Sequence, residues 1–526
     1  MSQLPDYVSS ANANPKESRS GWLTTAAATY AGVMLWFVFW QDVPTGGQAV
    51  AGGTLACGLP LAIAALVTAA VLCHVLFFMV PGLLGMKTGL PLAVVGTSTY
   101  GVTGGYLMPG LLMGLLQFGW LSVNAFFSGL LLAATFGFDK MSPTHLIVSI
   151  IWALIAMFMG LKGIKYVGAV ASFMPIIPIV ILGFMLFKTL PTYQEFDTTK
   201  MMAAEDKRIA AAQAELPKHF TDVDDFVKAN GYSVVADKAK RAEFKELEGQ
   251  YLAKKQVAEM KPAALYGNPQ WGVFSLMCAY VIGFFATAGA AGVGICSVVR
   301  SRVSVQFGGF FGIVVPTILS GAIALIAVAG AQKLALDSGQ TDLLTNYNAT
   351  QLFALIFSEQ YAKPAMFLLA VAAFPSACFC TLIAAECIKT SFPKINPWGS
   401  CGVGVAAAIA LVVTGYAGKA GDVFTVIGAS FGPICGAMAA DYILSGFRWA
   451  GPREGFNPAG WLSWFFGFIV GGATLVVTKF MGETMPYGIE IPCPPLSAFV
   501  VGFVLYIVFA SIGLQSKKID LPQRID

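Results

Sequence analysis

Four side chains that could bind a ligand recur along one apolar stretch. Gln117, Trp120, Asn124 and Ser128 are spaced three, four and four residues apart, which places them on one face of a helix. The indole of Trp120 offers a flat surface for stacking a planar ligand, and the amide of Asn124 offers one acceptor and two donors. A polar stripe of this kind avoids lipid, so it lines a site or contacts other helices. Both interpretations stay open, because Gln117 and Asn124 could simply bond neighbouring helices.

A second candidate position is Ser376, which follows Pro375 in another apolar stretch. A proline frees a backbone carbonyl of the preceding turn, and a cation could bind that carbonyl together with the hydroxyl. The alternative is a hydroxyl bonded within its own helix. Glu386 and His74 could carry a proton, but Glu386 could instead pair with Lys389, and His74 could be a hydrogen-bonded packing residue.

The stretch 288–294 contains Gly289, Gly292 and Gly294. Three glycines in seven residues weaken a helix, so this stretch could unwind and offer its backbone groups to a ligand. Small residues also let two helices pack closely, and the sequence favours neither interpretation.

Other kinds of chemistry lack the residues that they need. The apolar stretches contain no paired carboxylates, metal-ligand set or nucleophile–base set, and there is no Walker A motif. The ten cysteines form no CxxC pair, and the CxC of Cys378 and Cys380 has no histidine or third cysteine nearby. We therefore expect neither an enzyme nor an ATP-driven pump, and no metal or organic cofactor.

Composition indicates what surrounds these residues. Of the 526 residues, 56% are hydrophobic and 11% are charged, and the mean hydropathy is +0.71. Soluble domains carry about 25% charged residues, so this composition excludes both a water-soluble surface and a disordered chain. The net charge of +4 comes from scattered basic residues and does not indicate nucleic acid binding.

A membrane span needs about 20 mostly apolar residues. The stretches that qualify are 22–40, 54–86, 107–136, 144–164, 166–189, 271–297, 307–332, 364–388, 399–417, 422–446, 460–478 and 494–514. The second is long enough to contain a bend or a re-entrant piece. We therefore predict an all-α polytopic membrane protein of about 12 spans, without a cleavable signal peptide.

The Lys and Arg residues predict the orientation. If the N-terminus is cytoplasmic, the short loops and tails on that side hold 14 basic residues and the opposite short loops hold 5. Both termini are therefore predicted to be cytoplasmic, in the cell (inner or plasma) membrane. The insert 190–270 then lies outside; its 12 basic and 13 acidic residues predict exposed helices. It could decorate the outer face, form a lid or bind a protein partner.

The parity of the spans permits an inverted repeat. Spans one to five and six to ten would form two blocks of opposite orientation, followed by two C-terminal helices. The predicted segments are a cytoplasmic tail 1–21, a first block 22–189, the insert 190–270, a second block 271–446, spans eleven and twelve within 447–514, and a cytoplasmic tail 515–526. In such repeats the first helix of each block is broken at the midplane, and span one has only Gly32 in its interior.

Two groups of short motifs are distinctive. The first comprises Gly85–Pro91, Thr99–Val102, Gly105, Tyr106–Pro109, Gln117–Trp120 and Asn124; the second comprises Phe431–Pro433, Ala440–Tyr442, Arg448 and Gly455–Asn457. Together they resemble the nucleobase:cation symporter-1 family, especially its cytosine permease and purine permease branch. The resemblance covers most of the chain outside the insert. It implies a LeuT-like fold and uptake of a small nitrogen heterocycle driven by Na⁺ or H⁺.

The resemblance also implies site residues. The family places an aromatic residue on span three, an amide four residues later and an aromatic residue on span six. The substrate-binding candidates are then Trp120, Asn124, Phe284 and Phe285, to which we add Gln117, Gly32 and Cys380. The cation is expected near the carbonyls of Ala31 and Met34, with Ala373 and Ser376; Ala377 stands where the family has a second hydroxyl.

Several positions depart from the family pattern. The family's Asp-Phe-x-Arg after span six reads Ser297–Arg300 here, and Cys378, Cys380 and Leu382 fill a region that often holds asparagines. We expect a symporter of a nucleobase such as cytosine or a purine, or of a related heterocycle. The alternatives are a transporter of another small solute, such as an amino acid or ureide, and a sensor or docking protein that uses the insert.

Overall fold

The computed structural model describes residues 4–23, 50–162, 176–231, 233–340, 349–392, 394–481 and 489–520, and the single residues 44, 174, 344 and 485. Ten helices in these ranges are long and apolar enough to cross a membrane, and Pro397–Val413 is a shorter apolar helix. They correspond to predicted spans two to twelve, so the prediction of an all-α polytopic membrane protein is confirmed. Span one falls almost wholly outside the described residues.

The spanning helices are named here in chain order. They are α3 (Leu59–Leu72) with α4 (Met79–Thr88), α7 (Leu112–Thr135), α8 (Pro143–Leu161), α10 (Ile176–Tyr193), α14 (Pro269–Cys296), α16 (Val315–Asp337), α18 (Glu359–Ala372) with α19 (Phe374–Ser391), α20 (Pro397–Val413), α21 (Ala420–Leu444), α22 (Pro458–Leu475) and α23 (Pro494–Ser511). A π-helical turn over Cys73–Phe78 joins α3 to α4, so the long second stretch forms one helix over Leu59–Thr88 with a π-helical turn in its middle.

The spanning helices form two groups. Helix α7 packs against α8, α20 and the single span made of α18 and α19; we call these four spans the four-helix group. Helix α14 packs against α3, α4 and α21, and α16 packs against α3. Helix α21 also contacts α7, so it lies where the two groups meet. A site formed between α7, α14 and α21 therefore has walls that belong to both groups.

Helix α14 is continuous from Pro269 to Cys296, so of the two alternatives left open for 288–294 the structure shows close packing and not unwinding. Its glycines serve close packing instead. A Cβ atom added to Gly289 would lie 2.8 Å from the Cβ atom of Phe77 and 2.9 Å from its carbonyl oxygen. From the opposite side, a Cβ atom on Gly85 of α4 would lie 2.0 Å from the carbonyl oxygen of Val293. Small residues thus let the two backbones touch, as in other membrane helix pairs.

Two glycines of α14 provide a matched test of this packing. Gly289→Ala should destabilise the protein by about 1–3 kcal/mol, because the added methyl group collides with a neighbouring backbone. Gly294 is exposed and has no atom within 4 Å of an added Cβ. Gly294→Ala should therefore be neutral or stabilise the helix by about 0.5–1 kcal/mol. Thermal unfolding of the purified variants measures both, and equal effects would contradict the packing account.

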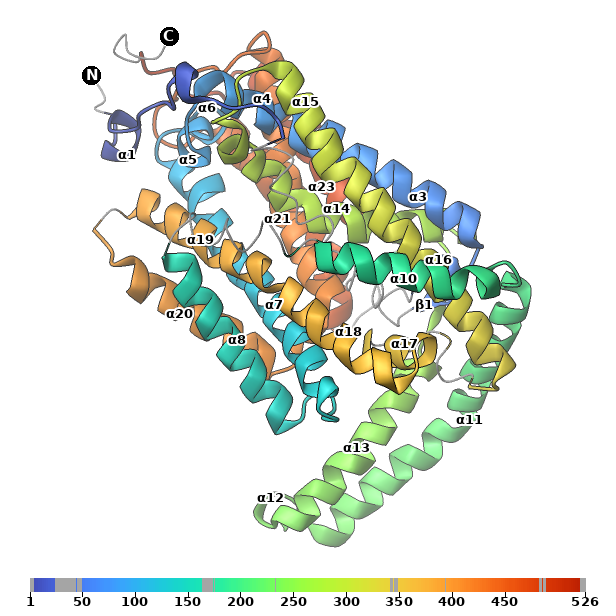
Figure 1. Ribbon diagram of the computed structural model, residues 1–526. Coiled ribbons are helices and arrows are strands. Elements are labelled where there is room, and N and C mark those ends of the chain that lie inside the picture. The colour runs from blue at the N-terminus through green and yellow to red at the C-terminus, as the bar shows by residue number, and fades with distance from the viewer. Residues whose placement is uncertain are drawn as a thin grey trace.

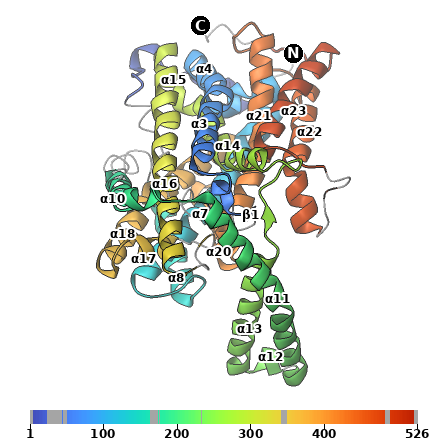
Figure 2. The ribbon, with the colours of Figure 1, turned by 90° about the vertical axis from the view of Figure 1, so that its right-hand side faces the viewer.

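The two terminal segments lie at one end of the molecule and the insert lies at the other (Figures 1 and 2). Near the N-terminus, the backbone of Asn14 bonds that of Gly89, and Ser20 exchanges backbone hydrogen bonds with Val298 and Arg300. The C-terminal segment forms a β-bridge between Lys518 and Arg453. All these partners lie near the loops at the same end of the molecule as the terminal segments.

The insert is a helical hairpin that projects from the opposite end (Figure 2). Its helices are α11 (Thr198–Asn230), α12 (Ser233–Ala236) and α13 (Lys238–Ala258), and α11 packs along α13. The base of the hairpin is fixed by the short parallel pairing of β1 (Val50–Ala51) with β2 (Lys261–Pro262). A buried ion pair between Glu205 and Arg208, 2.8 Å apart, also lies near the base.

A buried carboxylate anchors α21 near its C-terminal end. Asp441 accepts hydrogen bonds from the hydroxyls of Ser98 and Tyr506, each at 2.7 Å, and pairs with Arg453 at 3.2 Å. The side chains of Asp441 and Arg453 are only 4% and 5% exposed. The motif containing Asp441 was singled out from the sequence together with Arg448, but the ionic partner is Arg453. These bonds join α21 to α6 (Thr97–Tyr100), α23 and the loop before α22.

Candidate functional site

Trp120 lies on α7 and faces the interior of the molecule. Its indole N–H donates to the hydroxyl of Thr287 on α14, at 3.1 Å. Its ring centre lies 4.5 Å from that of Phe284 on α14 and 5.0 Å from that of Phe424 on α21. Three helices therefore hold the indole, and the aromatic cluster Trp120–Phe284–Phe424 forms where the two helix groups meet.

The two aromatic candidates on α14 differ in their surroundings. Phe285 is 2% exposed and belongs to the packed core, whereas Phe284 is half-buried and packs edge-on against Trp120. The structure therefore brings Phe284, rather than Phe285, into the aromatic cluster.

Sequence reasoning missed Thr287 and Phe424. Thr287 follows Phe284 by three residues, so a helical reading of α14 could have placed both on one face. Phe424 lies on α21, far along the chain, and no local pattern connects it with Trp120.

The side chain of Asn124 is fully used by neighbouring helices. Its amide nitrogen donates to the carbonyl oxygen of Ala373 at 3.0 Å and to the hydroxyl of Ser376 at 2.7 Å. Its amide oxygen accepts from the indole of Trp152 at 3.0 Å and from the hydroxyl of Ser128 at 3.4 Å. This geometry favours the alternative that Asn124 joins helices of the four-helix group, and leaves no donor for a substrate.

The other candidates of the stripe and of α19 have weaker connections. Gln117 is buried and donates to the sulfur of Met113 at 3.5 Å. Cys380 lies four residues after Ser376 on α19, and therefore on the same side of that helix, where it is half-buried. Gly32, Ala31 and Met34 lie outside the described residues, so the wall that span one would provide is not placed.

The predicted cation ligands meet at the junction of α18 and α19. Ala373 is the shared cap of these helices, and its carbonyl oxygen also accepts from the hydroxyl of Ser376 at 2.8 Å. Na⁺ is bound by oxygen lone pairs that face it. The oxygens of Ala373 and Ser376 already accept the N–H groups of Asn124, and the side chain of Ala377 has no oxygen atom. These three residues therefore do not fit a sodium ion in this arrangement.

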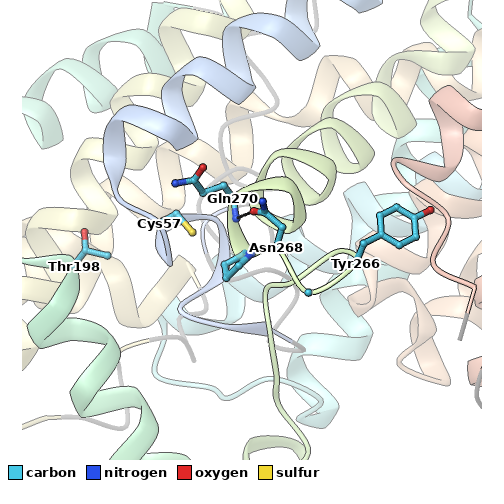
Figure 3. Close-up of a pocket in the computed structure, with 7 residues that line it drawn as sticks. Cys57, Thr198, Tyr266, Asn268 and Gln270 are labelled. Carbon is cyan, nitrogen blue, oxygen red and sulfur yellow. Dashed lines mark hydrogen bonds between the residues drawn. The ribbon is translucent and has the colours of Figure 1, made fainter.

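A separate open pocket lies at the N-terminal end of α14. It has a volume of about 660 Å³ and is lined by Cys57, Thr198, Tyr266, Gly267, Asn268, Pro269 and Gln270 (Figure 3). Asn268 caps α14, and its side chain accepts from the backbone N–H of Gln270 at 2.9 Å.

The pocket around Asn268 is distant from the aromatic cluster. Sixteen residues of α14 separate Asn268 from Phe284, which corresponds to about 24 Å along a helix. The two are therefore separate sites. Among the described residues, no group of three or more His, Cys, Asp or Glu side chains could hold a metal ion.

Comparison with known proteins supports the fold. No family model matches the sequence, and no curated protein matches it either. The solved structures that resemble it include Mhp1, a nucleobase-cation-symport-1 family transporter, closed with bromovinylhydantoin bound. That match has a TM-score of 0.57 and 13% identity, and it covers 96% of this chain and 97% of that chain.

Two further structures agree. Inward-facing Mhp1 has a TM-score of 0.59 and 13% identity, and the match covers 97% of this chain and 95% of that chain. The substrate-bound, outward-open state of a Na⁺-coupled sialic acid symporter has a TM-score of 0.52 and 12% identity, over 98% of this chain and 93% of that chain. The chain is therefore a multi-pass membrane protein with the LeuT-like fold of Mhp1, as the sequence motifs predicted.

Proposed function

We propose that this protein is a secondary active transporter that takes up a small planar nitrogen heterocycle by alternating access. The observation that carries the proposal is the inward-facing indole of Trp120, flanked by Phe284 and Phe424 at the meeting point of the two helix groups. Flat π-faces stack on flat π-faces, so these rings suit a planar solute. A nucleobase such as cytosine or a purine is the substrate class that the sequence motifs favour.

The placement of Trp120 and Phe284 on different helix groups supports alternating access. Trp120 belongs to the four-helix group, whereas Phe284 belongs to α14, which packs with α3 and α4. The Trp120 ring is in contact with those of Phe284 and Phe424, with centres 4.5 and 5.0 Å apart; if the two groups rock against each other, this contact would part toward one side of the membrane and then toward the other. A gradient of Na⁺ or H⁺ would drive the cycle, with both termini in the cytoplasm and the insert outside. The cation symporters that share the fold support the coupling to an ion gradient.

A ligand screen tests the substrate class. Purified protein should unfold at a higher temperature with the correct nucleobase, hydantoin, ureide or amino acid, because a ligand that binds only the folded state stabilises it. A planar heterocycle should give the largest shift. If only amino acids or other non-planar solutes raise the unfolding temperature, the proposed substrate class is wrong.

Truncating the insert tests the alternative that the protein is a sensor or docking protein. Its distal half is exposed, and the base is held by the pairing of β1 with β2. Gln213 of α11 bonds the carbonyl oxygen of Ala258 at 3.1 Å, so the two helices run side by side above the base.

Replacing residues 217–253 with a short Gly-Ser linker should therefore leave uptake within about two-fold of the wild type, because loop truncations away from a site are tolerated. Transport assays in cells measure this, with surface expression as the control. Loss of activity in a well-expressed variant would favour a sensor or docking protein that works through the insert.

A further inference from the structure

Three groups between α7 and the α18–α19 junction form a closed ring of hydrogen bonds. The amide nitrogen of Asn124 donates to both the carbonyl oxygen of Ala373 and the hydroxyl of Ser376, at 3.0 and 2.7 Å. The hydroxyl of Ser376 donates to the same carbonyl oxygen at 2.8 Å. A primary amide has two N–H groups, and both are used in this ring.

The oxygen atoms of this ring offer an ion at most one free lone pair, on the hydroxyl of Ser376, which is too few to hold a cation. The carbonyl oxygen of Ala373 accepts two hydrogen bonds, which matches its two lone pairs. The hydroxyl of Ser376 accepts one bond and donates another. A cation could bind here only after the amide of Asn124 had moved away.

Asn124 is held in this orientation from its other side. The indole N–H of Trp152 donates to the amide oxygen at 3.0 Å, and the hydroxyl of Ser128 does so at 3.4 Å. Exchanging the amide oxygen and nitrogen would set two acceptors against each other at Ala373, and two donors against each other at Trp152. The side chain is also only 8% exposed, so water cannot compensate for a lost bond.

We propose that the side-chain amide of Asn124 takes the place of a coupling sodium ion between α7 and the α18–α19 junction, so that uptake does not depend on Na⁺. The N–H groups carry partial positive charge and satisfy the same oxygens that a cation would bind, without adding net charge. The inference rests on the proposed transport function and selects H⁺ as the ion whose gradient drives it.

A stability measurement tests the inference without any substrate. The unfolding temperature of the purified wild type should be the same in NaCl and in choline chloride, because no Na⁺ binds to the folded state. Asn124→Asp replaces the two N–H donors with a carboxylate, which joins the oxygens of Ala373 and Ser376 as a ligand for a hard cation. This variant should be stabilised by Na⁺, and adding Ser376→Ala should remove the effect.

The response of the wild-type protein to Na⁺ can overturn the proposal. A rise in its unfolding temperature with NaCl but not with choline chloride, lost in Ser376→Ala, would show that Na⁺ binds at this position. Uptake into proteoliposomes that falls about ten-fold or more when choline replaces Na⁺ on both sides would also contradict the proposal. Such a fall corresponds to a loss of about 1.4 kcal/mol of coupling. If no heterocycle is bound or transported, the proposed function fails, but the salt comparison still decides the role of Asn124.

Discussion

Trp120→Ala should abolish high-affinity substrate binding and uptake. Stacking of a heterocyclic base on an aromatic side chain contributes about 1–3 kcal/mol, which corresponds to about 5- to 150-fold in Kd. The loss should lie at the upper end of this range, because the variant also removes the ring that Phe284 and Phe424 pack against. Binding is measured by the ligand-induced rise in unfolding temperature, and uptake is measured in cells.

Two further tryptophan variants separate stacking from general damage. Trp120→Phe keeps an aromatic face but loses the hydrogen bond to Thr287, so it should bind more weakly than the wild type and more tightly than Trp120→Ala. Trp398 on α20 is 44% exposed and lies outside the cluster, so Trp398→Ala should leave Kd unchanged. Wild-type affinity in a folded Trp120→Ala protein would move the substrate site elsewhere.

Arg453→Ala should cause the largest loss of stability, without touching the substrate. The variant leaves the carboxylate of Asp441 buried without its ionic partner, and breaking a buried pair in this way costs about 3–5 kcal/mol. The hydroxyls of Ser98 and Tyr506 remain as donors but do not carry a compensating charge. Thermal unfolding in detergent should therefore show a marked fall in unfolding temperature.

The double variant and an exposed ion pair serve as controls. Replacing both Asp441 and Arg453 with leucine should cost less than the sum of the two single changes, because no unpaired charge stays buried. Lys228 pairs with Asp224 on the insert, where the side chains are 68% and 43% exposed, so Lys228→Ala should have no measurable effect. An Arg453→Ala protein as stable as the wild type would show that the pair does not anchor α21.

The sequence predicted the spanning helices well, because the apolar runs are long and their charged ends are distinct. It could not decide the conformation of α14. The glycines that weaken a helix also allow close contact, and the outcome depends on Phe77, which arrives from another helix. In the structure that contact is present, and the helix continues through its glycines.

The candidate site shows the same division between local and long-range information. The helical stripe placed Trp120 and Asn124 on one face, and both side chains do face neighbouring helices. Their partners Thr287, Phe424 and Trp152 come from elements distant in sequence, so spacing alone could not identify them. Likewise, the sequence motifs grouped Ser376 with the cation candidates and not with Asn124, whereas Asn124 donates to its hydroxyl across the helix interface.

Uptake of a radiolabelled heterocycle into proteoliposomes tests the central claim most directly, with an inward proton gradient and no sodium. The account predicts accumulation above the external concentration, collapse of that accumulation on adding a protonophore, and no accumulation with Trp120→Ala. Accumulation that persists after all ion gradients are dissipated, or that is unchanged in Trp120→Ala, would contradict it.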